Sequence, residues 1–200
     1  MSQTKEAEVV DGRRLRSERS RKAIIEATLS LMYEGNLIPT AQAIAERAGV
    51  GIRSFFRHFA DMDALFAAVD EQDRDKYEAL FLGGNRDGTL EERILHAIER
   101  RSQGYEAEKN TLLSTAALLW RSEVLRTNYA RYQRGLRKDL GDWLPELKKL
   151  SRSRRQAVDA IASFEMWHRL RYHQGLSKTA AIKLPVELMD ELIETMTSWC

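Results

Sequence analysis

The chain has 200 residues, 43% of them hydrophobic and 31% charged, and its formal net charge at pH 7 is +2. This length allows one or two small domains with a core of their own. The small net charge argues against a general polyanion binder, so binding of nucleic acid would need local clusters of positive charge. The three prolines and the lack of alternating Val/Ile/Thr runs predict an all-α protein.

The composition also bears on the compartment. The single cysteine, Cys200, cannot form an internal disulfide, which suits a reducing cytoplasm. No apolar run reaches the length of about 18 residues that indicates a membrane span, and the first residues lack the apolar core of a signal peptide. We therefore expect a cytoplasmic protein without a membrane segment.

The N-terminal residues 1–16 are polar and without periodicity, so we expect a flexible arm. Residues 13–22, RRLRSERSRK, contain six basic residues and one acid. A basic stretch beside a DNA-binding domain can reach phosphates or the minor groove, although a solvated run of charges would have the same sequence. The first helix is expected from Ser17 to Tyr33.

The stretch from Pro39 to Phe66 carries the clearest pattern in the chain. Thr40 is suited to cap a short helix, and the apolar residues after it recur at helical spacing. Gly49 follows where the end of that helix requires positive φ, and Gly51 can begin the next helix. The sequence therefore predicts two short helices joined by a tight turn.

The second of these helices has two different faces. Phe55 and Phe59 are four residues apart and lie on one side, whereas Arg53 and Arg57, also four apart, lie on the other. A helix held by aromatic residues at its back, with arginines in front, fits the major groove of DNA.

The run AIAERAGVGIRSFFRHFADMDALF resembles the helix-turn-helix signature of the tetracycline-repressor (TetR) family of bacterial transcription regulators. The matching residues are Thr40, Ile44, Ala45, Ala48, Gly49, Val50, Arg57, His58, Phe59 and Leu65. Gly51, Phe56 and Met62 depart from the Ser, Tyr and Lys that the family usually has. The resemblance implies double-stranded operator DNA as a partner. The DNA contacts it implies are Thr40, Gly51, Ile52, Arg53, Ser54, Phe56, Arg57, His58 and Met62.

The chain beyond the helix-turn-helix predicts a second helical domain. Asp61 can cap a helix of about 20 residues, and Thr89 with Glu92 forms a capping box. The nearly all-apolar segment 111–120 is expected at the centre of this domain. Further helices are predicted over residues 125–143, over 153–173, and from a restart at Pro185.

The segment FEMWHRLRYHQGLS, Phe164 to Ser177, resembles the C-terminal part of TetR regulators, whose last helices pair two subunits. This implies a homodimer with Phe164, Trp167, Leu188, Leu192 and Met196 at its interface. The family usually holds a small-molecule inducer between the helices of the second domain. The residues that could line such a pocket are Leu112, Leu113, Ala116, Trp120, Tyr129, Tyr132, Phe164, Trp167 and His168. For each of them, a place in the ordinary hydrophobic core is the alternative.

No nucleotide-binding loop, hydrolase or metalloprotease motif is present, so no enzyme, catalytic residue or cofactor is predicted. His168 and His173 are five residues apart, which misses the spacing that pairs metal ligands on a helix, so no metal is expected. The predicted organisation is an arm over 1–16, a DNA-binding domain over 17–77 with the helix-turn-helix at about 40–59, and a ligand-binding and dimerisation domain over 78–200. The predicted function is that of a repressor released from a palindromic operator by an inducer. A protein-interaction module that uses the helix-turn-helix only as a scaffold is the alternative.

Overall fold

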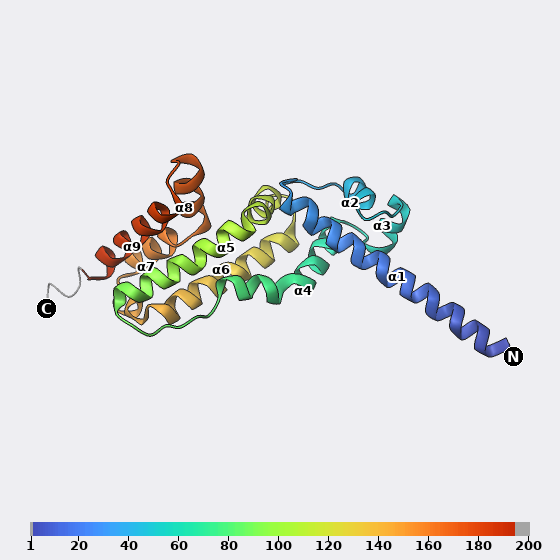
Figure 1. Ribbon diagram of the computed structural model, residues 1–200, viewed down its shortest axis with the longest axis horizontal. Coiled ribbons are helices and arrows are strands. Elements are labelled where there is room, and N and C mark those ends of the chain that lie inside the picture. Colours follow the sequence, from blue (N-terminus) through green and yellow to red (C-terminus); the bar gives the residue numbers. More distant parts are fainter. Residues whose placement is uncertain (1, 195–200) are drawn as a thin grey trace. The chain divides into compact units, whose positions relative to one another are not determined.

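The computed structural model describes residues 2–194, with side chains described from residue 12 onward. The described residues are helical and contain no strand, which confirms the predicted all-α class (Figure 1). The α-helices are α1 (Ser2–Tyr33), α2 (Ala41–Arg47), α3 (Ile52–His58), α4 (Met62–Phe81), α5 (Leu90–Leu118), α6 (Glu123–Trp143), α7 (Arg152–Ile161), α8 (Phe164–His168) and α9 (Lys178–Glu194). A 3-10 helix, η1 (Pro145–Lys149), follows α6, and a π-helical segment, η2 (Arg169–His173), follows α8.

The chain divides into two compact units. Unit 1 comprises the residues up to 74 together with 109–129, and unit 2 comprises 75–108 together with the residues from 130 onward. The first division lies close to the predicted border at residue 77. The apolar segment 111–120 was expected at the centre of the second domain, but it belongs to unit 1, where Ser114 Oγ donates to the Leu37 carbonyl at 2.8 Å.

Unit 1 is built around the contacts of α1, α2 and α3. Its core joins Ile24 and Ile25 of α1, Ile44 of α2, Phe55 of α3 and Leu65 of α4, and each of these side chains is fully buried. The α1 helix begins at Ser2, well before the predicted start at Ser17. The polar residues that were expected to form an arm are therefore helical. Ion pairs four residues apart stabilise such polar helices, and Arg14 with Glu18 forms one at 2.9 Å.

Unit 2 has its own core between α5, α6, α7 and α9. Ile94, Leu144, Val158 and Met189 are fully buried there and come from four separate segments of the chain. The predicted capping box starts α5: Glu92 Oε2 accepts from the Thr89 amide at 2.8 Å, and Thr89 Oγ1 accepts from the Glu92 amide at 3.2 Å. The helix then continues without interruption through residue 118.

The helix predicted over 153–173 is broken after Ala162, which corrects that prediction. In a continuous helix the Ala162 carbonyl would accept from the amide four residues later. Here it accepts from Arg101 Nη1 at 3.0 Å and from the Tyr105 hydroxyl at 2.9 Å. Ser163 then caps a new helix by accepting from the Met166 amide at 3.2 Å. The buried Arg101 thus takes over a carbonyl that the helix would otherwise use.

The predicted restart of the last helix at Pro185 is also wrong. The α9 helix begins seven residues earlier, because Ser177 Oγ accepts from the Ala180 amide at 3.2 Å and serves as its cap. Pro185 lies buried inside the helix. Its ring cannot supply the backbone donor that this position normally has, so its packing in unit 2 offsets part of that loss.

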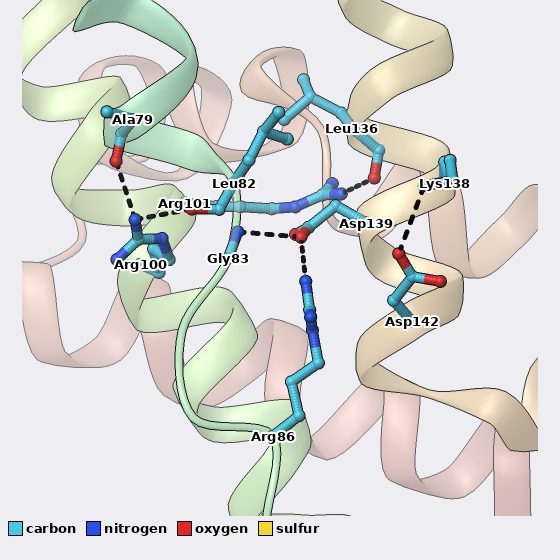
Figure 2. A network of polar contacts seen from close by, with 10 residues as sticks. All are labelled: Ala79, Leu82, Gly83, Arg86, Arg100, Arg101, Leu136, Lys138, Asp139 and Asp142. Carbon is cyan, nitrogen blue, oxygen red and sulfur yellow. Dashed lines mark hydrogen bonds and ion pairs between the residues drawn. The ribbon is translucent and has the colours of Figure 1, made fainter.

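A network of polar contacts holds the end of α4 in unit 2, as Figure 2 shows. Asp139 is 5% exposed and accepts from the Gly83 amide at 3.0 Å and from Arg86 Nη2 at 2.6 Å. Arg100 Nη2 donates to the carbonyls of Ala79 and Leu82, both at 2.7 Å. An α5 arginine therefore binds one carbonyl in the last turn of α4 and one just beyond its end, where helix carbonyls lack partners within their own helix.

Candidate nucleic-acid interface

The turn between α2 and α3 has the geometry that its sequence predicts. Thr40 adopts an extended backbone, and its Oγ1 accepts from the Ala43 amide at 3.2 Å, which caps α2. Gly49 has φ of 66°, a left-handed conformation that favours glycine after a helix. Gly51 caps α3 through its backbone alone, with no side-chain hydrogen bond.

The two faces of α3 separate as expected. Phe55 is 0% and Phe59 3% exposed, and both belong to the core of unit 1. Arg53 and Arg57 are exposed, and Arg57 Nη2 donates to Ser54 Oγ at 3.1 Å. The aromatic pair therefore holds the helix, and the arginines remain accessible to a ligand outside.

A bidentate ion pair holds α2 to α1. Arg47 Nη1 and Nη2 donate to the two carboxylate oxygens of Glu34 at 2.6 and 2.7 Å. Hydrogen bonds from Arg47 and from Ser30 lower the pKa of the Glu34 carboxyl to about 2. This pair fixes the C-terminal turn of α2 and so contributes to the position of the α2–α3 turn.

The other predicted DNA contacts differ in their accessibility. Thr40 and Gly51 are exposed, and Phe56 is 52% exposed with its ring edge-on to Phe55 at 5.2 Å. Ile52 and Met62 are half-buried and pack against the core of unit 1. Both therefore help to hold α3 and the start of α4, and only part of each side chain is available to DNA.

Arg21 of α1 joins this surface, although it was not among the predicted contacts. Its guanidinium lies over the Phe59 ring at 5.3 Å from the centroid. Partial burial and the positive charges of Arg57 and Arg21 lower the pKa of the neighbouring His58. The basic run 13–22 indicated that this part of the chain could reach DNA. The sequence alone did not show which face of α1 lies against α3.

The residues predicted to line an inducer pocket fall into both units. Leu112, Leu113, Ala116, Trp120 and Tyr129 belong to unit 1, and Tyr132, Phe164, Trp167 and His168 belong to unit 2. Trp120 is 78% exposed, so most of its side chain faces solvent. In unit 2, Phe164 and Trp167 stack at 5.8 Å and both contact Tyr105, within an aromatic cluster.

The predicted dimer interface is only partly accessible. Phe164 and Trp167 are 9% and 4% exposed, so they belong to the interior and offer little surface to a second chain. Both residues were expected at the interface between subunits, whereas the structure buries both side chains within unit 2. Leu188 and Leu192 of α9 are half-buried, and Met196 lies outside the described residues.

Residues 2–194 contain no helix that is long and apolar enough to cross a membrane. Among the described side chains, those of residues 12–194, no cluster of three or more His, Cys, Asp or Glu is suited to a metal ion.

Together, the short helix pair, its tight glycine turn and the exposed arginines of α3 define a helix-turn-helix DNA-binding protein. Residues 24–69 match the family model of bacterial regulatory proteins, tetR family. The chain thus carries the DNA-binding domain of tetR-family transcriptional regulators, and the resemblance seen in its sequence is confirmed. A search of curated proteins gave no significant match.

Solved structures share the fold over most of the chain. A transcriptional regulator from Streptomyces coelicolor A3(2) superposes with a TM-score of 0.60 at 21% identity, covering 88% of this chain and 99% of that chain. A transcriptional regulator from Rhodococcus sp. Rha1 has a TM-score of 0.61 at 18% identity, covering 88% and 96%. A third structure, described as a TetR-family transcriptional regulator from Rhodococcus sp., has a TM-score of 0.59 at 20% identity and covers 88% and 100%. At these identities the likeness concerns the fold.

Proposed function

We propose that this protein is a homodimeric repressor that binds a near-palindromic operator and releases it when a small molecule binds. The observation that carries the DNA-binding part is the α3 helix, with Phe55 and Phe59 buried behind it and Arg53 and Arg57 exposed in front. In a dimer, two such helices would enter successive major grooves about 34–36 Å apart, or a multiple of that distance.

Within each half-site we assign different roles to the residues. Arg53 has no hydrogen bond or ion pair within the described chain and is free to pair with the edge of a guanine. Thr40, Phe56, Arg57 and His58 would lie along the sugar–phosphate backbone, with Arg21 adding positive charge. Phosphate contacts of this kind set the register of the protein on DNA, whereas the base contact sets the sequence.

Release by an inducer requires a connection from the second domain to the helix-turn-helix. Within unit 1, Asn110 Nδ2 donates to the Tyr33 carbonyl at 2.7 Å, and Ser122 Oγ donates to Asp63 Oδ1 at 2.5 Å. Residues 109–122 are thereby bound to the end of α1 and to the start of α4. We infer that a ligand which shifts α5 or α4 changes the spacing of the recognition helices. The coupling needed is of order 1–3 kcal/mol.

A gel-shift titration with the DNA upstream of the protein's own gene tests the proposal. The wild-type protein should bind specifically. Arg53→Ala should lose roughly 1–3 kcal/mol of operator affinity and relax the preference at one base pair per half-site. Arg134→Gln, which changes an exposed arginine of α6 in unit 2, is the matched control and should bind as the wild type does.

The rival function, an interaction module with the helix-turn-helix as scaffold, predicts a different result. Such a protein would bind no DNA fragment more tightly than random sequence, and Arg53→Ala would change nothing. An unaltered base preference in a binding-site selection with Arg53→Ala would remove this residue from the readout even if the protein binds DNA.

A further inference from the structure

A pocket of about 410 Å³ lies in unit 2 between the last turns of α6, η1 and the start of α7. Its inner wall is apolar, because Leu140 is 2% exposed and Leu147 packs against the same core. Pockets that hold small molecules typically measure roughly 300–1,000 Å³ and combine apolar walls with a few polar groups. None of the residues predicted for DNA or inducer binding lines this pocket.

The charges around the pocket are predominantly positive. Arg137, Lys148, Arg152 and Arg155 line it together with a single acid, Asp159. Arg137 forms an ion pair with that acid, because its Nε and Nη2 donate to Asp159 Oδ2 at 3.0 and 2.7 Å. The other three cations form no ion pair with any residue between 12 and 194. No ion pair with a residue in that range offsets their mutual repulsion.

The same arginines stand where a helix disfavours positive charge. The first turn of α7 contains Arg152, Arg154 and Arg155 but no acidic residue, contrary to the preference of the helix dipole. Arg154 is used structurally, because its Nη1 donates to the Leu192 carbonyl at 3.4 Å. Among residues 12–194, Arg152 and Arg155 have no comparable partner. Local arrangements that lower stability and have no compensating contact in the fold are expected at functional positions.

Gly141 leaves the pocket open on the α6 side. It lies inside α6 and lines the pocket, and a Cβ built on it would meet no atom within 4 Å. Glycine is among the least favourable residues in a helix interior, and space for a side chain is available here. Because Gly141 lines the pocket and has open space beside it, we expect a large side chain at this position to reach into the pocket.

We propose that this pocket binds a small organic anion. Its carboxylate, sulfonate or phosphate group would be held by Lys148, Arg152 and Arg155, and its apolar body would lie on Leu140 and Leu147. Charge-assisted hydrogen bonds from guanidinium groups suit such oxyanions. The inference does not rest on DNA binding or on inducer release.

The test uses the full chain and a pair of matched fluorescent probes. The anion 8-anilinonaphthalene-1-sulfonate should bind the wild-type protein saturably, with one site per chain. N-phenyl-1-naphthylamine has the same aromatic body without the sulfonate and should bind at least tenfold more weakly. Arg152→Gln/Arg155→Gln should weaken binding of the sulfonate at least tenfold, whereas Arg134→Gln, also on the surface of unit 2, should change it less than twofold.

A steric variant tests the pocket itself. Gly141→Leu should fill the space and abolish the site, while its melting temperature stays at or above that of the wild type. Gly141→Ala keeps most of the volume and should retain measurable binding. The proposal is overturned if the wild-type protein does not bind the sulfonate, or if the neutral probe binds equally well. It is also overturned if the double arginine variant and a folded Gly141→Leu protein bind as the wild type does.

Discussion

His58 lies at the end of α3 in surroundings that disfavour its protonated form. Partial burial, followed by the charges of Arg57 and Arg21, holds its pKa below the ordinary value of 6.5. The unfolded chain therefore binds a proton here more readily than the folded protein does. As a result, the free energy of unfolding contributed by His58 falls as the pH drops through about 6.5.

His58→Gln should remove this part of the acid sensitivity. Urea unfolding of both proteins at pH 7.5 and pH 5.5 measures it, and the wild type should lose more free energy of unfolding between the two values than the variant. The remaining histidines and the carboxylates are common to both proteins, so their contributions cancel in the comparison. Equal losses in the two proteins would show that His58 does not titrate in this way.

Met62, the first residue of α4, lies at the other end of the proposed DNA interface. Its side chain packs partly on the core, and a lysine there could keep its stem on that core with the ammonium group in water. Met62→Lys should steepen the slope of log affinity against log salt by about 0.9 per subunit, because each neutralised phosphate adds that amount. It should tighten binding to operator and random DNA alike.

Salt titrations of both proteins with both DNAs test the Met62 prediction. A small loss of thermal stability should accompany the gain in affinity, since a positive charge near a helix N-terminus costs some tenths of a kcal/mol. Coincident slopes would mean that residue 62 does not face phosphate.

At the scale of elements, Gly104 shows how tightly α5 packs in unit 2. A Cβ on this residue would lie 2.5 Å from Cε1 of Phe81, whose ring is 2% exposed. Replacing glycine by alanine inside a helix normally stabilises by up to about 1 kcal/mol. Overpacking of a core costs about 1–3 kcal/mol, so Gly104→Ala should give a net loss of up to about 2 kcal/mol.

The matched control for this prediction is Gly135 in α6. A Cβ there meets nothing within 4 Å, so Gly135→Ala should stabilise by up to about 1 kcal/mol. Thermal or urea unfolding should show changes in the free energy of unfolding of opposite sign for the two variants if packing against Phe81 decides the outcome. A stabilised Gly104→Ala protein would show that the ring can move aside at little cost.

The start and end signals of most elements could be predicted because they depend on neighbouring residues. Thr40, Gly49, Asp61 and the box of Thr89 and Glu92 all act within four residues of themselves, and the structure bears them out. The exposed arginines of α3 follow from the same local periodicity. Residue patterns within one helical turn were therefore sufficient to predict the helix-turn-helix and the two faces of α3.

Features that depend on distant residues were not predictable in this way. The break after Ala162 requires Arg101, which lies 61 positions earlier in the chain. The place of residues 111–120 in unit 1 requires Leu37, 77 positions from Ser114. The accessibility of Phe164 and Trp167 likewise depends on Tyr105. A helical stripe shows that a side chain is apolar, but it does not show which partner covers it.

At the scale of the whole molecule, we predict a dimer in solution through α9 and the helical segment before it. Leu188 of α9 is half-buried, and Tyr172 of η2 is 43% exposed, so both leave apolar area for a second chain. Light scattering at micromolar concentration should give about twice the chain mass of 23.0 kDa. Leu188→Glu, which introduces charge into that surface, should shift the mass toward the single chain.

Two results would contradict the predicted dimer. One is a mass of 23.0 kDa for the wild-type protein. The other is a dimer that Leu188→Glu leaves intact while the variant stays folded, which would move the interface to another surface. Because a palindromic operator is bound by two chains, loss of the dimer should also weaken operator binding.

The arginines of α5 have a consequence for how far the sequence of unit 2 can diverge. Arg100 and Arg101 bind four main-chain carbonyls, those of Ala79, Leu82, Leu136 and Ala162. Every amino acid carries this acceptor, so a substitution at any of the four positions leaves the hydrogen bond available. In a deep mutational scan, the two arginines should tolerate almost no replacement, whereas exposed Ala79 should accept most residues other than proline. A fold whose helices are joined by hydrogen bonds to main-chain carbonyls can be kept while many of its side chains change. This is compatible with a fold shared at only 18–21% identity.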